Sequence, residues 1–156
     1  MKVLILFESF FGNTEKVARA VGGVLAGAAE VTVVRVNDAR LEQLKGIDFL
    51  LIASPTRGFR PGEATQAFLA RLPAGSLKGV KAAALDTRID PNGLTSKLLK
   101  LMVKSFGYAD KALVSGLEKA GAEMAAAPQG FIVNGREGPL KKGELERAQV
   151  WAQTLL

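Results

Sequence analysis

Residues 2–14 read KVLILFESFFGNT, and this stretch decides the fold class. Lys2–Phe7 is a short continuous apolar run, which is typical of a strand buried on both faces. The segment Thr14–Ala28 follows, and its valines recur at helical spacing. The stretch therefore predicts a strand, a tight loop around Gly12 and a helix, which together are the opening unit of an α/β protein.

The same alternation continues along the chain. Strands are predicted at Val31–Val36, Ile47–Ala53, Val80–Leu85 and, in two halves split at Pro128-Gln129-Gly130, at Glu123–Ala127 and Phe131–Val133. Helices are predicted at Leu41–Lys45 (weak), Glu63–Leu72, Leu94–Phe106, Ala109–Ala120 and Gly143–Leu156. This rhythm predicts a parallel sheet with helices on both faces. No linker or repeat interrupts it, so we expect a single domain over residues 1–156.

Composition excludes several kinds of chemistry. The 156 residues include no Cys and no His, which excludes disulfides, thiol nucleophiles, imidazole bases and His-ligated metals. A net charge of +6 favours anionic partners, but the positive charge is not clustered as in nucleic-acid binders, so we expect no nucleic-acid partner. Charged residues break every apolar run, and the N-terminus does not resemble a signal peptide. We expect a cytoplasmic protein without membrane insertion and without a metal site.

Three loops are candidates for ligand binding, because ligands of parallel sheets bind beyond the carboxyl ends of the strands. In the first, Glu8–Asn13, Gly12 allows a tight turn and Ser9 and Thr14 offer hydroxyls. Unpaired amides and the helix dipole at the following helix favour a dianion there, so this loop is a candidate phosphate site. The alternative is that Asn13 is only a helix cap and Gly12 only a turn residue.

The pattern Ser9-x-x-Gly12-Asn13-Thr14 after an apolar strand resembles the flavodoxin signature, which wraps the phosphate of flavin mononucleotide (FMN). The resemblance spans nearly the whole chain in element order and length. It implies a flavodoxin-like three-layer sandwich around a five-stranded parallel sheet of order 2-1-3-4-5. It also implies FMN as cofactor, bound through Ser9, Phe10, Phe11, Gly12, Asn13 and Thr14. Phe11 stands where the family usually has a hydroxyl, which removes one hydrogen bond to the phosphate.

The second loop, Ser54–Pro61, borders the isoalloxazine ring according to the resemblance. The cofactor-binding residues predicted here are Pro55, Thr56, Arg57 and Gly58. Flavodoxins often stack an aromatic side chain on the flavin in this region. Arg57 stands near that place, with Phe59 two residues later, and a guanidinium can also stack on a planar ring. The alternative is that the prolines only stiffen a turn and that the arginines are solvated.

The third loop is predicted at Asp86–Gly93, with Asp86, Thr87 and Arg88 as cofactor-binding residues. Flavodoxins commonly present a second stacking aromatic here, and this segment has none. By the resemblance, its backbone would bond the pyrimidine edge of the flavin, with help from Thr87. The alternative for Asp86 is a turn-forming residue at a strand end.

Charge near the ring distinguishes this chain from the flavodoxins it resembles, which are typically acidic electron carriers. Arg57, Arg60 and Arg88 lie in the two loops expected to embrace the flavin. Because a cation stabilises a nearby anion, we predict that reduction of the flavin is easier here than in an acidic flavodoxin.

Three functions remain open from the sequence. The first is an FMN-binding redox protein that carries electrons to an unknown partner protein, and it needs no acid or base from the chain. The second is an FMN-dependent NAD(P)H or quinone-type oxidoreductase acting on a small anionic substrate, which the basic loops favour. The third is a flavin-free interaction module, which is favoured by Phe11 and by the absence of an aromatic residue from the third loop. FMN affinity and nicotinamide oxidation discriminate between them.

Overall fold

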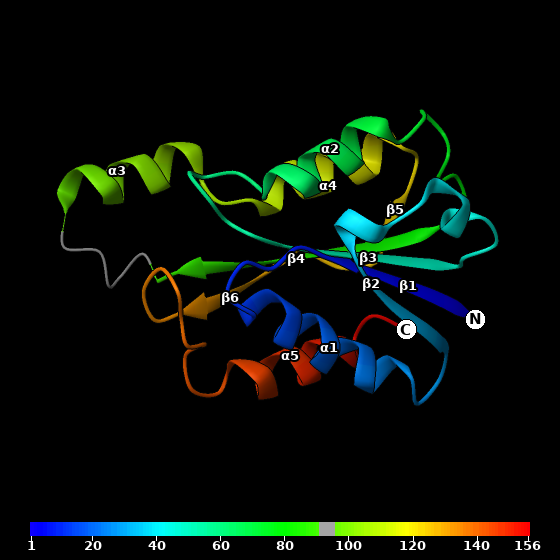
Figure 1. Cartoon of the computed structure of the whole chain (residues 1–156), viewed down its shortest axis with the longest axis horizontal. Coiled ribbons are helices and arrows are strands. Elements are labelled where there is room, and N and C mark those ends of the chain that lie inside the picture. The colour runs from blue at the N-terminus through cyan, green and yellow to red at the C-terminus, as the bar shows by residue number, and fades with distance from the viewer. Residues whose placement is uncertain (91–95) are drawn as a thin grey trace.

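A computed structural model of the chain describes residues 1–90 and 96–156 (Figure 1). Its strands are β1 (Lys2–Phe7), β2 (Glu30–Arg35), β3 (Phe49–Pro55), β4 (Lys81–Ile89), β5 (Glu123–Met124) and β6 (Gln129–Val133). They form one parallel sheet of order β2-β1-β3-β4-β5, in which β6 also pairs with β4. The predicted order is confirmed. The last strand is divided as predicted, but the break lies at residues 125–128, where Pro128 has no amide hydrogen to donate. Gln129 and Gly130, which were predicted in the interruption, belong to β6 and pair with β4.

Helices cover both faces of the sheet (Figure 1). Helices α1 (Asn13–Leu25) and α5 (Glu144–Ala152) lie on one face, and α2 (Glu63–Arg71) and α4 (Asp110–Lys119) lie on the other. Helix α3 (Lys97–Phe106) extends beyond the end of the sheet. Two short 3-10 helices follow β2, at Val36–Asp38 and at Leu41–Leu44, and the second of them stands where the weak helix Leu41–Lys45 was predicted. In the described part of the chain no helix is both long and apolar enough to span a membrane.

The core follows from the alternation of side chains along each strand. Val3, Ile5 and Phe7 of β1 pack in the cluster shared with α1 and α5, whereas Leu4 and Leu6 pack in the cluster shared with α2 and α4. Successive strand residues point to opposite faces, so a strand covered on both sides is apolar throughout. This explains the uninterrupted apolar run at the start of the sequence.

Strand β4 is longer than the sequence predicts. Asp86, Thr87 and Arg88, which we expected in a loop, lie within β4 and pair with Gly130, Phe131 and Ile132 of β6. The loop prediction was wrong here because polar residues break the apolar pattern, while the partner strand β6 is far away in sequence. Residues 91–95, the end of that predicted loop and the start of the predicted helix Leu94–Phe106, lie outside the described residues.

Candidate functional site

A hollow of about 340 Å³ opens where β1, β3 and β4 end. Its lining includes most of the predicted residues: Ser9, Phe10, Phe11, Asn13, Thr14, Pro55, Thr56, Arg57, Gly58, Thr87 and Arg88. Gly12 and Asp86 do not line it, while Ile89, Val133 and Arg136 do. Its size falls within the range of small-molecule sites. Four segments far apart in sequence, the three predicted ones and the one that follows β6, therefore meet where the fold class predicts a ligand site.

The loop before α1 presents a set of unpaired amides. Gly12 has a φ of 90°, and its N–H donates to Ser9 Oγ at 3.1 Å. Within residues 1–90 and 96–156, the backbone N–H groups of Phe10, Phe11, Asn13, Thr14 and Glu15 have no acceptor. These donors surround the positive end of a 13-residue helix. Unpaired amides at such a helix end are the donors that a phosphate dianion accepts from.

Buried side chains hold this loop in place. Asn13 is not a helix cap, because its Nδ2 donates to Glu137 O at 2.9 Å and α1 has no side-chain cap. Thr14 Oγ1 lies 2.7 Å from Thr87 Oγ1. Arg35 donates from its guanidinium to Ser9 O at 2.9 Å. The side chains of Asn13 and Thr14 therefore position the loop, and its backbone amides remain for a ligand.

Glu8 has a structural role that the sequence did not reveal. Its Oε2 accepts from Thr65 N at 2.9 Å and from Thr65 Oγ1 at 2.6 Å, at the start of α2. A Cβ at Gly62 would overlap this buried carboxylate, so the glycine lets α2 approach it. A carboxylate is favourable at a helix N-terminus because it pairs with the amides there.

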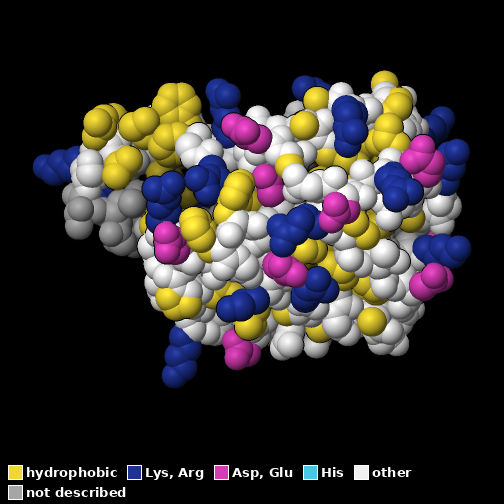
Figure 2. All heavy atoms as spheres, viewed as in Figure 1, with side chains coloured by type: hydrophobic (Ala, Val, Ile, Leu, Met, Phe, Trp, Pro, Cys, Tyr) yellow, Lys and Arg dark blue, Asp and Glu magenta, His cyan; other side chains and the backbone are white. Residues whose placement is uncertain are grey.

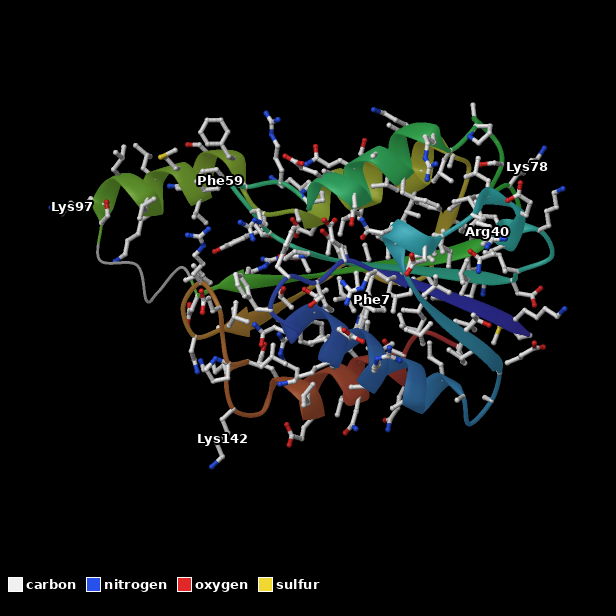
Figure 3. All side chains as sticks on the ribbon, viewed as in Figure 1. Phe7, Arg40, Phe59, Lys78, Lys97 and Lys142 are labelled. Atoms are coloured by element: carbon white, nitrogen blue, oxygen red, sulfur yellow. The ribbon has the colours of Figure 1, made fainter. Side chains whose placement is uncertain are left out.

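The second loop contains a tight turn. Arg57 N donates to Arg60 O at 2.8 Å, and Arg60 N donates to Arg57 O at 3.1 Å. The two residues between them have positive φ, 53° at Gly58 and 68° at Phe59. Positive φ at both central residues is typical of a type I′ turn. The Arg57 guanidinium lies 4.3 Å from the Phe10 ring centroid, which joins the first two loops. Phe59 instead lies beside the end of α3, with its ring centroid 5.7 Å from that of Phe106 (Figure 3).

Beneath the hollow, a polar network surrounds Asp86, which is fully buried. Thr56 Oγ1 donates to it at 2.7 Å, and Arg88 donates to both carboxylate oxygens. Burial raises the pKa of Asp86, while the bonds from Arg88 and Thr56 oppose this rise. Burial alone would lower the pKa of Arg88, but its bonds to Asp86 and the charge of Asp110, 3.4 Å away, outweigh burial and raise it.

The three arginines that the sequence places in the second and third loops do not all lie at the first hollow. Arg88 does line the hollow, but it lies on a strand and two carboxylates balance its charge. Arg60 lines a neighbouring hollow of about 720 Å³ instead. Arg57 lines both hollows. Neither Arg57 nor Arg136 has a carboxylate within 4.0 Å among the described residues, so these two bring unbalanced positive charge to the first hollow.

Sequence analysis missed Arg136 and the apolar lining residues Ile89 and Val133. All three lie at or just after the carboxyl ends of β4 and β6. The position of Arg136 after the last strand was a usable signal, since every loop at that edge is a candidate for ligand contact. Ile89 and Val133 could be predicted as lining residues only from the pairing of β4 with β6, in which they are direct neighbours.

No family model matches the sequence, and no curated protein matches it. Solved structures do match. Oxidised flavodoxin 1 from Bacillus cereus is 18% identical over 99% of this chain and 97% of its own, with a TM-score of 0.78. Flavodoxin 2 from the same organism is 21% identical over the same shares, also with a TM-score of 0.78. The flavodiiron protein from Giardia intestinalis is 18% identical over 99% of this chain and 35% of its own, with a TM-score of 0.72. Together with the strand order, these likenesses show that the chain has the flavodoxin fold.

Proposed function

We propose that the chain binds FMN in the first hollow and works as a redox protein that carries electrons through the flavin. The observation that best supports this proposal is the set of five backbone amides at the start of α1 that have no acceptor within the described part of the chain and that open onto the hollow. A phosphate dianion would accept from these amides and would be favoured by the helix dipole. The resemblance of residues 9–14 to the flavodoxin phosphate loop supports the same assignment.

The remainder of the hollow suits a flat ring system. Pro55, Ile89 and Val133 offer apolar contacts, and Arg57 offers a guanidinium for stacking. When bound, FMN would supply the electron-transfer chemistry that a chain without Cys and His cannot provide from its side chains. The chain itself would hold the phosphate through its loop amides and tune the flavin through Arg57 and Arg136.

Titration of the apoprotein with FMN, followed by quenching of flavin fluorescence, tests this proposal. We expect a Kd below about 1 µM, equivalent to ~8 kcal/mol of affinity. Riboflavin, which lacks the phosphate, is the matched control ligand and should bind at least about a hundredfold more weakly. A Kd for FMN above about 100 µM contradicts the proposal and favours a flavin-free interaction module. Equal affinity for the two flavins contradicts the role of the phosphate loop.

The second hollow favours an FMN-dependent oxidoreductase as a second candidate function. Phe10 and Arg57 line both hollows. A ligand in the second hollow would therefore be separated from a ligand in the first by this pair of side chains. Arg60 adds positive charge there for an anionic substrate or a nicotinamide phosphate. The test is oxidation of NADPH by the FMN-loaded protein with a soluble quinone as acceptor. Turnover that Arg60→Gln lowers without weakening FMN binding supports this candidate, and oxidation no faster than with free FMN contradicts it.

A further inference from the structure

Helix α3 has an apolar surface that the rest of the described chain does not cover. None of its ten residues is buried, and the side chains of Leu98, Leu101 and Phe106 are 66%, 59% and 63% exposed. Figure 1 shows the helix extending beyond the sheet, and Figure 2 shows hydrophobic side chains gathered over it. A helix of a domain normally turns its apolar face to the core, so a large exposed apolar patch marks an interaction site.

Positive charge accompanies this apolar surface. Lys97, Lys100 and Lys104 recur at helical spacing and share one side of α3. The helix contains no Asp or Glu. Leu98, Met102 and Phe106 lie on the other side, while Leu101 lies one turn from both Lys97 and Lys104 and borders the lysines. An apolar surface bordered by lysines makes α3 a basic amphipathic helix, the composition of helices that lie in a membrane interface.

The positive charge of α3 favours a lipid surface as its binding partner over a second copy of the chain or another protein. Because the lysines border Leu101, a second copy seated on the same surface would bring three more lysines close to these three, with no acidic side chain on either helix to pair with them. A protein partner would need a shaped groove for a protruding helix, whereas a fluid layer of lipid headgroups adapts to one. Anionic headgroups would neutralise the lysines while the acyl boundary covers the leucines. We propose that α3 binds the surface of membranes that contain anionic lipids.

This binding would place the hollow close to the membrane. The contact between Phe106 and Phe59 ties α3 to the turn after Arg57, and Gly58 in that turn lines the hollow. The inference does not depend on FMN binding, because α3 contributes no residue to the hollow. It can therefore be tested on the protein with or without flavin, and its failure leaves the FMN proposal untouched.

Co-sedimentation of the full chain with vesicles tests the proposal. We expect binding to mixed phosphatidylcholine and phosphatidylglycerol vesicles, little binding to pure phosphatidylcholine, and release at high salt. Leu98→Gln combined with Leu101→Gln should lower the partition coefficient by about tenfold or more. Val150→Gln is the matched control, since Val150 is 63% exposed on α5, and it should change nothing.

The lysines are tested in the same assay. Lys97→Gln combined with Lys104→Gln should lower partitioning by about fivefold for each charge removed. The matched control is Lys119→Gln combined with Lys142→Gln, which removes equal charge elsewhere; Lys142 lies on the α5 side of the molecule (Figure 3). The Phe106→Trp variant should show a blue shift of its emission with anionic vesicles only, because the natural Trp151 is already buried.

Three results would overturn the assignment. The first is an absence of binding to the anionic vesicles. The second is an equal loss of binding in the α3 variants and in their controls, which would mean adsorption through net charge alone. The third comes from sedimentation equilibrium without lipid: a dimer that the Leu98→Gln and Leu101→Gln changes dissociate would assign this face to a second copy of the chain.

Discussion

The hydroxyl groups of Thr14 and Thr87 lie 2.7 Å apart, and both side chains are buried. Thr14 stands in the first turn of α1 and Thr87 within β4, 73 residues later in the chain. Both line the first hollow. This bond therefore fastens the candidate phosphate loop to the sheet and sets where the loop amides lie relative to the rest of the site.

Replacing one member of this pair should destabilise the fold. Thr87→Val leaves the Thr14 hydroxyl buried without its partner, which should cost about 1–3 kcal/mol in the free energy of unfolding. Urea denaturation measures the change, with Thr87→Ser as the control that keeps the hydroxyl. The combined Thr14→Val and Thr87→Val variant should cost less than the sum of the two single changes. Additive costs would mean that the two hydroxyls do not depend on each other.

Restoring a hydroxyl at position 11 should strengthen FMN binding. Phe11 lines the hollow with 46% of its surface exposed, and its backbone amide is one of the five that have no acceptor among the described residues. Phe11→Thr adds a donor for a charged phosphate, a bond of about 1.5 kcal/mol that corresponds to roughly tenfold in Kd. Phe11→Leu is the control that removes the ring without adding a hydroxyl. If both variants bind FMN equally well, the added hydroxyl is not the cause.

The reduction potential of bound FMN should depend on Arg57 but not on Arg60. Arg57 lines the first hollow, whereas Arg60 lines only the second, although the two are joined through one turn. Removing the cation destabilises the reduced, more negative flavin, so Arg57→Gln should lower the two-electron midpoint potential by about 20 mV or more. Arg60→Gln serves as the control in the same potentiometric titration. Equal shifts in both variants would show that net charge, and not position, sets the potential.

Glu144 should make stability depend on acid pH. Its carboxylate accepts from Ile132 N at 2.6 Å and pairs with Arg147. Burial opposes ionisation, but the bonds from Arg147 and Ile132 outweigh it and lower the pKa of Glu144 below its ordinary 4.5. A lowered folded pKa contributes stability that is present above pH 4.5 and lost as the pH falls through the folded pKa.

Thermal unfolding between about pH 3 and pH 7 checks this prediction. Glu144→Gln should destabilise the chain at neutral pH and flatten the loss of stability in acid. Glu146→Gln, an exposed change on the same helix, should leave the pH profile as it is. A profile for Glu144→Gln parallel to that of the natural chain would mean that this carboxylate does not contribute to the acid sensitivity.

Much of the site could be predicted from the sequence because the patterns that indicate it involve residues close together in the chain. The apolar run Lys2–Phe7, the turn at Gly12 and the helix after it depend on residues close together in the chain. The carboxyl ends of parallel strands meet at one edge, so strand positions alone indicate which loops converge. That reasoning led to three of the four segments around the hollow and to most of its lining residues.

Contacts between residues far apart in the chain could not be predicted in this way. Asp86 and Arg88 look like loop residues in sequence, and only the pairing of β4 with β6 makes them strand residues whose charges balance each other. Glu8 reaches a helix that starts 55 residues later, and Arg136 enters the hollow from the last loop. Such contacts depend on which segments meet, which no local pattern encodes.

The sequence by itself determined the class of fold, the order of its elements and the place of the candidate phosphate loop, because hydrophobic periodicity and turn chemistry act over short stretches of chain. Only the tertiary structure decided that Arg57 and Arg136, and not Arg88, bring unbalanced charge to the hollow. It also decided that α3 keeps its apolar side exposed. Charge balance and burial are properties of residues brought together by folding, so they follow from the packing of the whole chain.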